Sequence, residues 1–423
     1  MGLFRNLLGR LGRISVDMMV VTLLLILIPG LPPYIRFESF RNTPAMELVG
    51  KLEPNNKLDR ATAILNGEVV GPESIAIRGN ELYTGLIGGN VIKYVDGKAS
   101  LVAKFGLECE GKWEEKKCGR PLGMRFSSEG RLIVADAYYG IFNVDVDKGK
   151  VETLVSSNDT IDGKLPMNPN DLDIAKDGSI YWSDSSTHSY LQDAIDEFLG
   201  EPSGRLIRTD PKTKKSEVLL NGLHFANGVQ LSKDEEFVVV SESVRSRVMK
   251  YHLKGDKKGT SEVFIDGLPG SPDNIRSNGR GGFYISLIAP RYSNKSTLID
   301  ILGPVPYARK FLLRILHIIK IGLYGVNTVL PNEYAAKAEY YAGHLEPIAQ
   351  MLPKHSIILE VDRNGNVIRS FHGRSKVHHI SEISLDNEGK FAYLGSPYNT
   401  QIWKVDVEEL NTCAKKIVEI NMG

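Results

Sequence analysis

Four residues with oxygen-bearing side chains occupy the same place in four similar stretches of the chain. In each stretch the oxygen-bearing residue lies two positions before an apolar residue, and a glycine-containing turn and a second strand-like run follow. The four residues are Glu73, Asn170, Asn227 and Asp273. Carboxylate and amide oxygens are hard ligands, which suit Ca2+ better than zinc or copper. If the fold brings these positions together, the sequence predicts a calcium site.

The repetition of the motif indicates a fold that does this. Two further stretches, at Leu122 and Ser381, share the register, so the motif occurs six times. Successive copies lie 46 to 57 residues apart, except that 108 residues separate the last two. A period of roughly 40 to 50 residues that is rich in strand signals is typical of β-propeller blades. We therefore expect an all-β fold, a six-bladed β-propeller whose innermost strands bring the four oxygen-bearing residues to the central channel.

The long fifth interval contains an insertion at about residues 290–354, which has a different periodicity. On a helical projection from Arg309 to Ile321, the basic residues fall on one face and most apolar residues fall on the other. Such a helix can lie in a membrane interface, and residues 306–325 are the candidate segment. The alternative is a lid helix that packs its apolar face on the propeller. Both interpretations place the insertion over one mouth of the channel.

The N-terminus carries an apolar run that follows basic residues. Residues 18–28 are apolar apart from Thr22, and the segment 14–35 around them approaches the ~20 residues that span a bilayer. Arg5, Arg10 and Arg13 precede the run, which by the positive-inside rule keeps the N-terminus in the cytosol. Residues 1–35 are therefore predicted to form a cytosolic tail and a signal-anchor transmembrane helix. A cleaved signal peptide is the alternative, although no small-residue cleavage site follows.

The rest of the chain divides into a linker and one large domain. Residues 36–60 mix charge, proline and asparagine without periodicity, and they are predicted to form a linker stalk. Residues 61–423 are assigned to the propeller, with residues 61–65 as a strand that closes the ring against the last blade. In a single-pass type II membrane protein this domain lies in the lumen or outside the cell, at the endoplasmic reticulum or the plasma membrane. The 52 basic and 51 acidic residues give no reason to expect nucleic acid as a partner.

Two kinds of covalent modification follow from that location. Cys109 and Cys118 bracket a short charged loop, and outside the cytosol we expect them to form a disulfide bond. Asn158 and Asn294 each begin an Asn-X-Ser/Thr glycosylation sequon. Asn158 lies between two blades beside polar residues and is the stronger candidate of the two.

Five short motifs carry a family resemblance. They are Gly-Arg-Pro-Leu-Gly at 119–123, Phe-Ala-Asn-Gly-Val at 225–229, Gly-Ser-Pro-Asp-Asn at 270–274, Ile-Ser-Glu-Ile at 380–383 and Tyr-Leu-Gly-Ser at 393–396. In combination they resemble strictosidine synthase-like members of the calcium-dependent phosphotriesterase superfamily. The resemblance covers the whole chain. It implies a six-bladed propeller in a type II membrane protein with arylesterase-like hydrolysis.

The resemblance also implies roles for single residues. The four oxygen-bearing residues of the repeat match the calcium ligands of the paraoxonases, and Asn274 matches a further polar neighbour of that metal. Glu382 falls where strictosidine synthases keep a catalytic glutamate, and its alternative role is a structural carboxylate that is hydrogen-bonded to neighbouring blades. Leu122 occupies the place of the paraoxonase proton-shuttling histidine, so this general base is missing. His378 and His379 come closest to the repeat among the histidines, and both are expected to be loop residues.

Together these patterns predict a membrane-anchored, calcium-dependent hydrolase of aryl esters or lactones. A calcium ion on the axis would polarise the carbonyl group, and Asp273 and Glu382 are the candidate catalytic carboxylates. A non-catalytic membrane propeller that binds a partner or a lipid is the first alternative, which the missing histidine favours. A strictosidine synthase-like condensing enzyme is the second, and the intact calcium set argues against it. The sequence does not indicate an oligomeric state.

Overall fold

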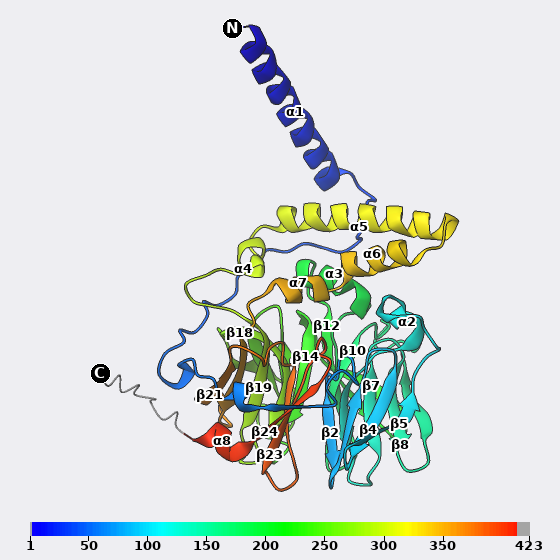
Figure 1. Cartoon of the computed structure of the whole chain (residues 1–423), viewed down its shortest axis with the longest axis vertical. Coiled ribbons are helices and arrows are strands. Elements are labelled where there is room, and N and C mark those ends of the chain that lie inside the picture. Colours follow the sequence, from blue (N-terminus) through cyan, green and yellow to red (C-terminus); the bar gives the residue numbers. More distant parts are fainter. Residues whose placement is uncertain (1, 413–423) are drawn as a thin grey trace, which may run out of the picture.

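The strands of the chain form six antiparallel sheets of four strands each, in the computed structural model, which describes residues 2–412. The innermost strand of each sheet contacts the innermost strands of both neighbouring sheets, so the six sheets form a closed ring (Figure 1). This arrangement is the six-bladed β-propeller that the repeat predicts, and the all-β fold class is confirmed. Residues 413–423, the predicted end of the propeller domain, lie outside the described residues.

Each blade is one sheet, and its strands are numbered here in chain order. Blade one contains β2 (Ile75–Arg78), β3 (Glu81–Gly85), β4 (Asn90–Val95) and β5 (Lys98–Lys104). Blade two contains β6 (Pro121–Phe126), β7 (Leu132–Asp136), β8 (Gly140–Asp145) and β9 (Lys150–Ser156). Blade three contains β10 (Pro169–Ile174), β11 (Ile180–Asp184), β12 (Gly204–Asp210) and β13 (Lys215–Leu223).

The other three blades follow the same plan. Blade four contains β14 (Ala226–Leu231), β15 (Phe237–Glu242), β16 (Arg247–His252) and β17 (Ser261–Ile265). Blade five contains β18 (Gly270–Ser277), β19 (Phe283–Pro290), β20 (Ser356–Val361) and β21 (Val367–Gly373), with the insertion between β19 and β20. Blade six contains β22 (Glu382–Leu385), β23 (Phe391–Gly395), β24 (Ile402–Asp406) and, as its outer strand, β1 (Thr62–Ile64).

The first strand of the chain completes the last blade. Thr62 of β1 pairs with Lys404 of β24 in an antiparallel register, as predicted for residues 61–65. The segment 36–60, which was expected to be a stalk, lies against the propeller. Leu58 in this segment is fully buried beside blade six, and Leu52 packs into the core between blades four and five.

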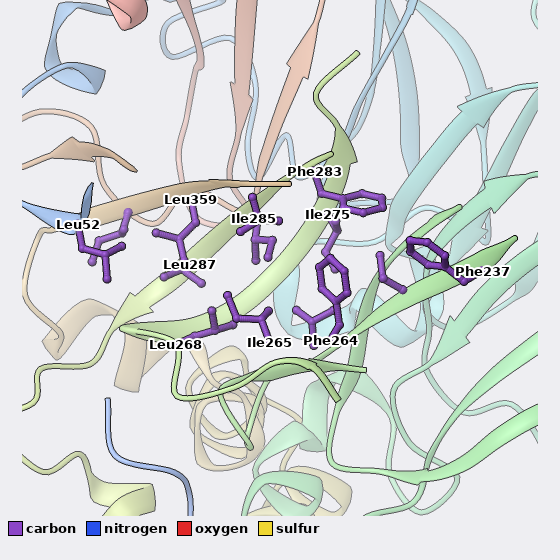
Figure 2. Packing of buried hydrophobic residues seen from close by; sticks show 14 residues of the cluster. Leu52, Phe237, Phe264, Ile265, Leu268, Ile275, Phe283, Ile285, Leu287 and Leu359 are labelled. Atoms are coloured by element: carbon purple, nitrogen blue, oxygen red, sulfur yellow. The ribbon is translucent and has the colours of Figure 1, made fainter. Parts of the chain in front are cut away.

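Apolar side chains between neighbouring blades form the core. Figure 2 shows one such cluster, in which Phe237, Phe264 and Phe283 from blades four and five lie side by side. The rings of Phe264 and Phe283 meet edge to face, with their centroids 5.6 Å apart. Because β-branched and aromatic residues favour the pleated, two-sided environment of these strands, the sequence forms sheets here. Packing of one blade on the next then fixes the radius of the ring.

Helices gather at one end of the propeller. They are α1 (Gly2–Leu27), α2 (Glu115–Cys118), α3 (Ala194–Leu199), α4 (Leu298–Leu302), α5 (Pro306–Val329), α6 (Glu333–Gly343), α7 (Glu346–Met351) and, at the other side, α8 (Val407–Asn411). Helix α5 lies across this end, and α1 extends away from it (Figure 1). Helix α1 ends just before Pro29 and Gly30, and its apolar side chains from Ile14 to Leu27 are largely exposed.

Helix α5 presents its basic residues and Leu313 to the protein, and most of its other apolar residues face the outside. Arg309 is fully buried and donates to the carbonyl oxygens of Leu199 and Gly200 at 2.7 and 3.1 Å. Arg314 donates to the carbonyl oxygens of Leu25, Ile26 and Ile28, which belong to the last turn of α1 and the residue that follows it. This orientation argues against the alternative of a lid that packs its apolar face on the propeller, although Leu313 and Leu316 do pack on α3. Guanidinium groups can face inward here because they donate hydrogen bonds to backbone carbonyl oxygens at the C-terminal ends of α1 and α3.

The outer surface of α5 is apolar as a consequence. Its exposed large side chains are Tyr307, Leu312, Ile318, Ile319, Ile321, Tyr324, Val326 and Val329. Among the described residues, α5 is the helix whose length and mean hydropathy of 1.3 fit a membrane span. Its polar contacts with α1 and with the propeller side hold it across the mouth of the channel, as both sequence interpretations required.

Candidate functional site

Irregular strand pairing turns the predicted side chains toward the channel. In blades two to five, the register between the first two strands shifts near the beginning of the innermost strand, which indicates a β-bulge. The residues at these shifts include Leu122, Asn170, Asn227 and Asp273. Glu73 occupies the corresponding place just before β2. A β-bulge interrupts the regular alternation of side chains, so it can aim a residue at the axis while the rest of the strand keeps its register.

Glycine follows the axis residue in blades two and four because the next blade passes close by. A Cβ atom on Gly123 would lie 2.5 Å from the Cα of Asp171, and a Cβ atom on Gly228 would lie 2.5 Å from the carbonyl oxygen of Asp273. These separations are shorter than van der Waals contact, so a side chain would push the blades apart. The two glycines therefore allow the innermost strands to approach each other at the height of the site.

The axis residues line a single cavity of about 100 Å³. Glu73, Asn170, Asn227 and Asp273 all contribute to its wall, and so does Leu122. The convergence that the repeat predicts is thus present in the structure. Binding of calcium by these side chains stays a prediction.

Buried oxygens without a donor make this site suitable for a cation. Oε2 of Glu73, Oδ1 of Asn227 and Oδ1 of Asn274 are buried and lack a hydrogen-bond partner. Burial raises the pKa of Asp273 to about 8, and burial together with the charge of Asp273 raises the pKa of Glu73. A divalent cation would give these oxygens a partner and offset two buried carboxylate charges. In the part of the chain that the structure describes, no group of three or more His, Cys, Asp or Glu side chains could hold a metal, so the donor set has to include amides.

Asn274 is held in one orientation by two carboxylates. Its Nδ2 donates to Oε1 of Glu73 at 2.7 Å and to Oε2 of Glu382 at 3.3 Å. Both contacts use the amide nitrogen, which leaves Oδ1 as the free acceptor. Asn274 does not line the cavity, so it lies one layer behind Glu73.

Glu382 belongs to a buried ionic network below the cavity. Its Oε2 accepts from Arg276, which also forms two hydrogen bonds with Asp171, at 2.7 and 3.1 Å. Its Oε1 accepts from the backbone nitrogen of Ile75 at 3.0 Å and from Ser384 Oγ at 2.5 Å. Glu382 is fully buried and is not among the residues that line the cavity. This placement favours the alternative role, a carboxylate that is hydrogen-bonded to neighbouring blades.

The insertion and the disulfide loop form the roof of the cavity. Tyr340 from the end of α6 and His344, Leu345 and Glu346 from the start of α7 line it, opposite the axis residues. Glu346 forms an ion pair with Lys112 of the disulfide loop at 2.6 Å. The insertion is therefore attached to the loop that closes the other side of the cavity.

Glu115 and His344 are cavity residues that the sequence did not reveal. Glu115 accepts a hydrogen bond from Tyr138 and lies 3.7 Å from Nε2 of His344. Burial raises the pKa of Glu115 to about 7, whereas burial and the charges of Arg120 and Lys112 lower the pKa of His344 to about 3. Glu115 therefore changes its protonation state near neutral pH, and His344 stays neutral. For Glu115 the signal in the sequence was the predicted disulfide, because the short loop that it closes holds the helix with Glu115 in place.

The predicted disulfide is present, and the two predicted glycosylation sites lie at the surface. Cys109 and Cys118 form the predicted disulfide, with their Cα atoms 5.6 Å apart, and they enclose α2 with Glu115. Asn158 and Asn294 are both exposed in turns. Their glycosylation stays a prediction. His378 and His379 lie in the connection before β22 and do not line the cavity.

Comparison with known proteins identifies the family. Residues 50–94 match the family model of the strictosidine synthase-like N-terminal region, and residues 170–256 match that of strictosidine synthase. The chain is 40% identical over 400 residues to the adipocyte plasma membrane-associated protein Hemomucin of Drosophila melanogaster, which covers 92% of this chain and 68% of that protein. It is 33% identical over 401 residues to the adipocyte plasma membrane-associated protein of Homo sapiens, which covers 92% of this chain and 88% of that protein. The chain belongs to the adipocyte plasma membrane-associated protein family.

Membership of the adipocyte plasma membrane-associated protein family confirms the resemblance inferred from the five motifs. Among solved structures, the chain is similar to a gluconolactonase from Xanthomonas campestris, with a TM-score of 0.52 and 14% identity over 90% of this chain and 99% of that one. At this level of identity the likeness shows a shared fold alone. The chain of the adipocyte plasma membrane-associated protein family thus shares its propeller fold with this gluconolactonase.

Proposed function

We propose that this chain is a membrane-anchored, calcium-dependent hydrolase of aryl esters or lactones. The observation that carries the proposal is the single cavity lined by Glu73, Asn170, Asn227 and Asp273, in which buried acceptor oxygens lack partners. A gluconolactonase shares the fold, which supports a hydrolytic use of this architecture.

The residues around the cavity divide into ligands and proton carriers. Glu73, Asn170, Asn227 and Asp273 would hold calcium, which when bound acts as a Lewis acid toward an ester or lactone carbonyl. Because Leu122 cannot accept a proton, a carboxylate that faces the cavity has to do so. Asp273 is the first candidate, and Glu115, whose pKa of about 7 suits proton transfer near neutral pH, is the second. Glu382 acts as a positioning residue, because it contacts Asn274 and Arg276 instead of the cavity.

Hydrolysis of phenyl acetate by the full-length protein tests this function. We expect turnover in calcium-containing buffer, loss of turnover with a chelator, and recovery when calcium is restored. Thermal unfolding with and without chelator provides the companion measurement, because a bound ion stabilises the folded state. No turnover under any of these conditions would contradict the proposed activity.

Leu122 also supports a second candidate function. An apolar residue in the place of a general base is expected in a propeller that binds a partner or a lipid without catalysis. In that case the chelator lowers the midpoint of thermal unfolding, and no ester is hydrolysed at any calcium concentration. The two measurements together therefore separate the two functions.

We further propose that α1 anchors the propeller in the membrane as a type II protein. Its apolar side chains are exposed from Ile14 to Leu27, and the outward apolar surface of α5 lies at the same end. Arg314 joins the two helices, and relatives are named plasma membrane-associated proteins. The full-length protein is expected to stay in the membrane pellet after a high-salt wash and to dissolve with detergent. Release by salt alone would contradict the anchor.

A further inference from the structure

A second cavity, of about 180 Å³, adjoins the axis cavity and is strongly apolar. Helices α3, α4 and α7 and the end of β19 surround it. Its aliphatic lining includes Ile195, Leu199, Ile288, Leu298, Ile348 and Leu352. We call this space the side cavity.

Most polar groups on the wall of the side cavity are engaged with the protein, and the exception is Nη1 of Arg291, which is buried without a hydrogen-bond partner. Ser243 Oγ donates to the carbonyl oxygen of Pro272 at 2.6 Å, and Ser271 Oγ donates to that of Ser243 at 2.8 Å. The charge of Arg291 is compensated by Asp300 at 2.9 Å. The side cavity therefore offers little to an ionic or hydrogen-bonding ligand and favours an aliphatic one.

The side cavity adjoins the axis cavity and shares part of its wall with it. Six residues line both: Phe198, Ser243, Ser271, Ile288, Leu345 and Tyr398. Movement of these shared side chains would let a ligand with its polar group at the axis extend an apolar arm into the side cavity.

The outer end of the side cavity faces the apolar surface of the molecule. Leu298 on α4 is 56% exposed and Ile348 on α7 is 37% exposed, and both line this cavity. Helices α4 and α7 lie at the end of the propeller from which α1 extends (Figure 1). An aliphatic chain in the side cavity would thus point toward the part of the protein with the most exposed apolar side chains.

We propose that the side cavity binds the aliphatic acyl chain of an ester or lactone whose carbonyl group lies at the axis site. This inference rests on the proposed function for the position of the carbonyl group. It narrows the substrate class from aryl esters in general to esters and lactones with a medium or long aliphatic acyl chain. Phenyl acetate would then be a minimal substrate that leaves the side cavity empty.

Initial rates on p-nitrophenyl esters of increasing acyl length provide the first test. Burial of each added methylene is expected to lower KM about threefold until the side cavity is filled, with kcat nearly constant, because this binding is equal in the ground state and the transition state. Ala349→Leu fills part of the side cavity, so it should raise KM for the octanoyl ester at least tenfold more than KM for the acetyl ester. Ala338→Leu, on the exposed face of α6, is the matched control and should keep the wild-type ratio.

Photocrosslinking provides a second test that needs no hydrolysis. The detergent-solubilised full chain is irradiated with a diazirine-bearing fatty acid, and the labelled peptides are identified by mass spectrometry. Label on residues 288–290 and 345–352, reduced in Ala349→Leu and unchanged in Ala338→Leu, is the expected result. KM values that do not depend on acyl length, with label confined to α1 and α5, would overturn the proposal. If no ester is hydrolysed but the cavity peptides are labelled, the proposed hydrolase function fails and the aliphatic binding site stands.

Discussion

Replacement of Asp273 by asparagine is expected to lower kcat/KM for phenyl acetate by about a thousandfold or more. Asparagine has nearly the same shape but lacks the negative charge, so it can neither accept a proton from water nor balance a divalent cation as Asp273 would. Asp273 lines the axis cavity together with the other predicted ligands, which places the lost charge at the reacting centre. Initial rates at saturating calcium, together with calorimetric calcium binding, measure the effect.

The control for this change is Asp256→Asn, an exposed aspartate in the turn between β16 and β17. It makes the same chemical substitution far from the cavity and should leave both the rate and calcium binding at wild-type values. Glu382→Gln is expected to weaken hydrolysis by a smaller factor, because Glu382 acts through Asn274 and Arg276. Wild-type turnover in Asp273→Asn would remove this residue from the mechanism.

Replacement of Arg276 by methionine is expected to lower the free energy of unfolding by about 3–5 kcal/mol. Arg276 is buried and bridges Asp171 and Glu382, both of which are fully buried. Without the guanidinium group Glu382 loses its counter-charge inside the protein, where solvent cannot replace it, and Asp171 keeps only the more distant Arg125, at 4.0 Å. Urea unfolding followed by circular dichroism measures the change.

Arg280→Met in the same blade serves as the control. Arg280 also pairs with a buried carboxylate, that of Glu360, but its own side chain is 56% exposed and Arg369 contacts the same carboxylate at 2.6 Å. Its removal is expected to cost about 1 kcal/mol or less. The double variant Arg276→Met with Glu382→Gln should be more stable than Arg276→Met alone, since one unpaired charge is gone. Equal effects of Arg276→Met and Arg280→Met would contradict the importance of the network.

The sequence predicted those features that depend on local pattern and repetition. Alternating apolar residues indicated the strands, and the shared position of Glu73, Asn170, Asn227 and Asp273 within the repeat placed them at one height in the channel. The same register predicted that Leu122 would lie beside them, as it does. These inferences succeeded because rotational symmetry makes equivalent positions in successive blades meet.

Contacts between unlike elements could not be predicted in this way. Glu115 and His344 reach the cavity from a disulfide loop and from the insertion, and neither follows the repeat. The helical projection of α5 separated a basic face from an apolar one, but it did not say which face was inside. Arg309 and Arg314 turn inward because they donate hydrogen bonds to backbone carbonyl oxygens at the ends of α3 and α1. Such partners exist only in the folded chain.

The pairing of β1 with β24 has a consequence for how the molecule is made and cut. Thr62 and Lys404 are 342 residues apart, so β1, which is synthesised first, can pair only after β24, the last strand, has been synthesised. Ring closure is therefore a late, non-local event in folding. Because β1 lies after the N-terminal helix, cleavage between residues 28 and 34 would leave the ring closed by β1, whereas cleavage just after Ile64 would cut the covalent link between β1 and blade one.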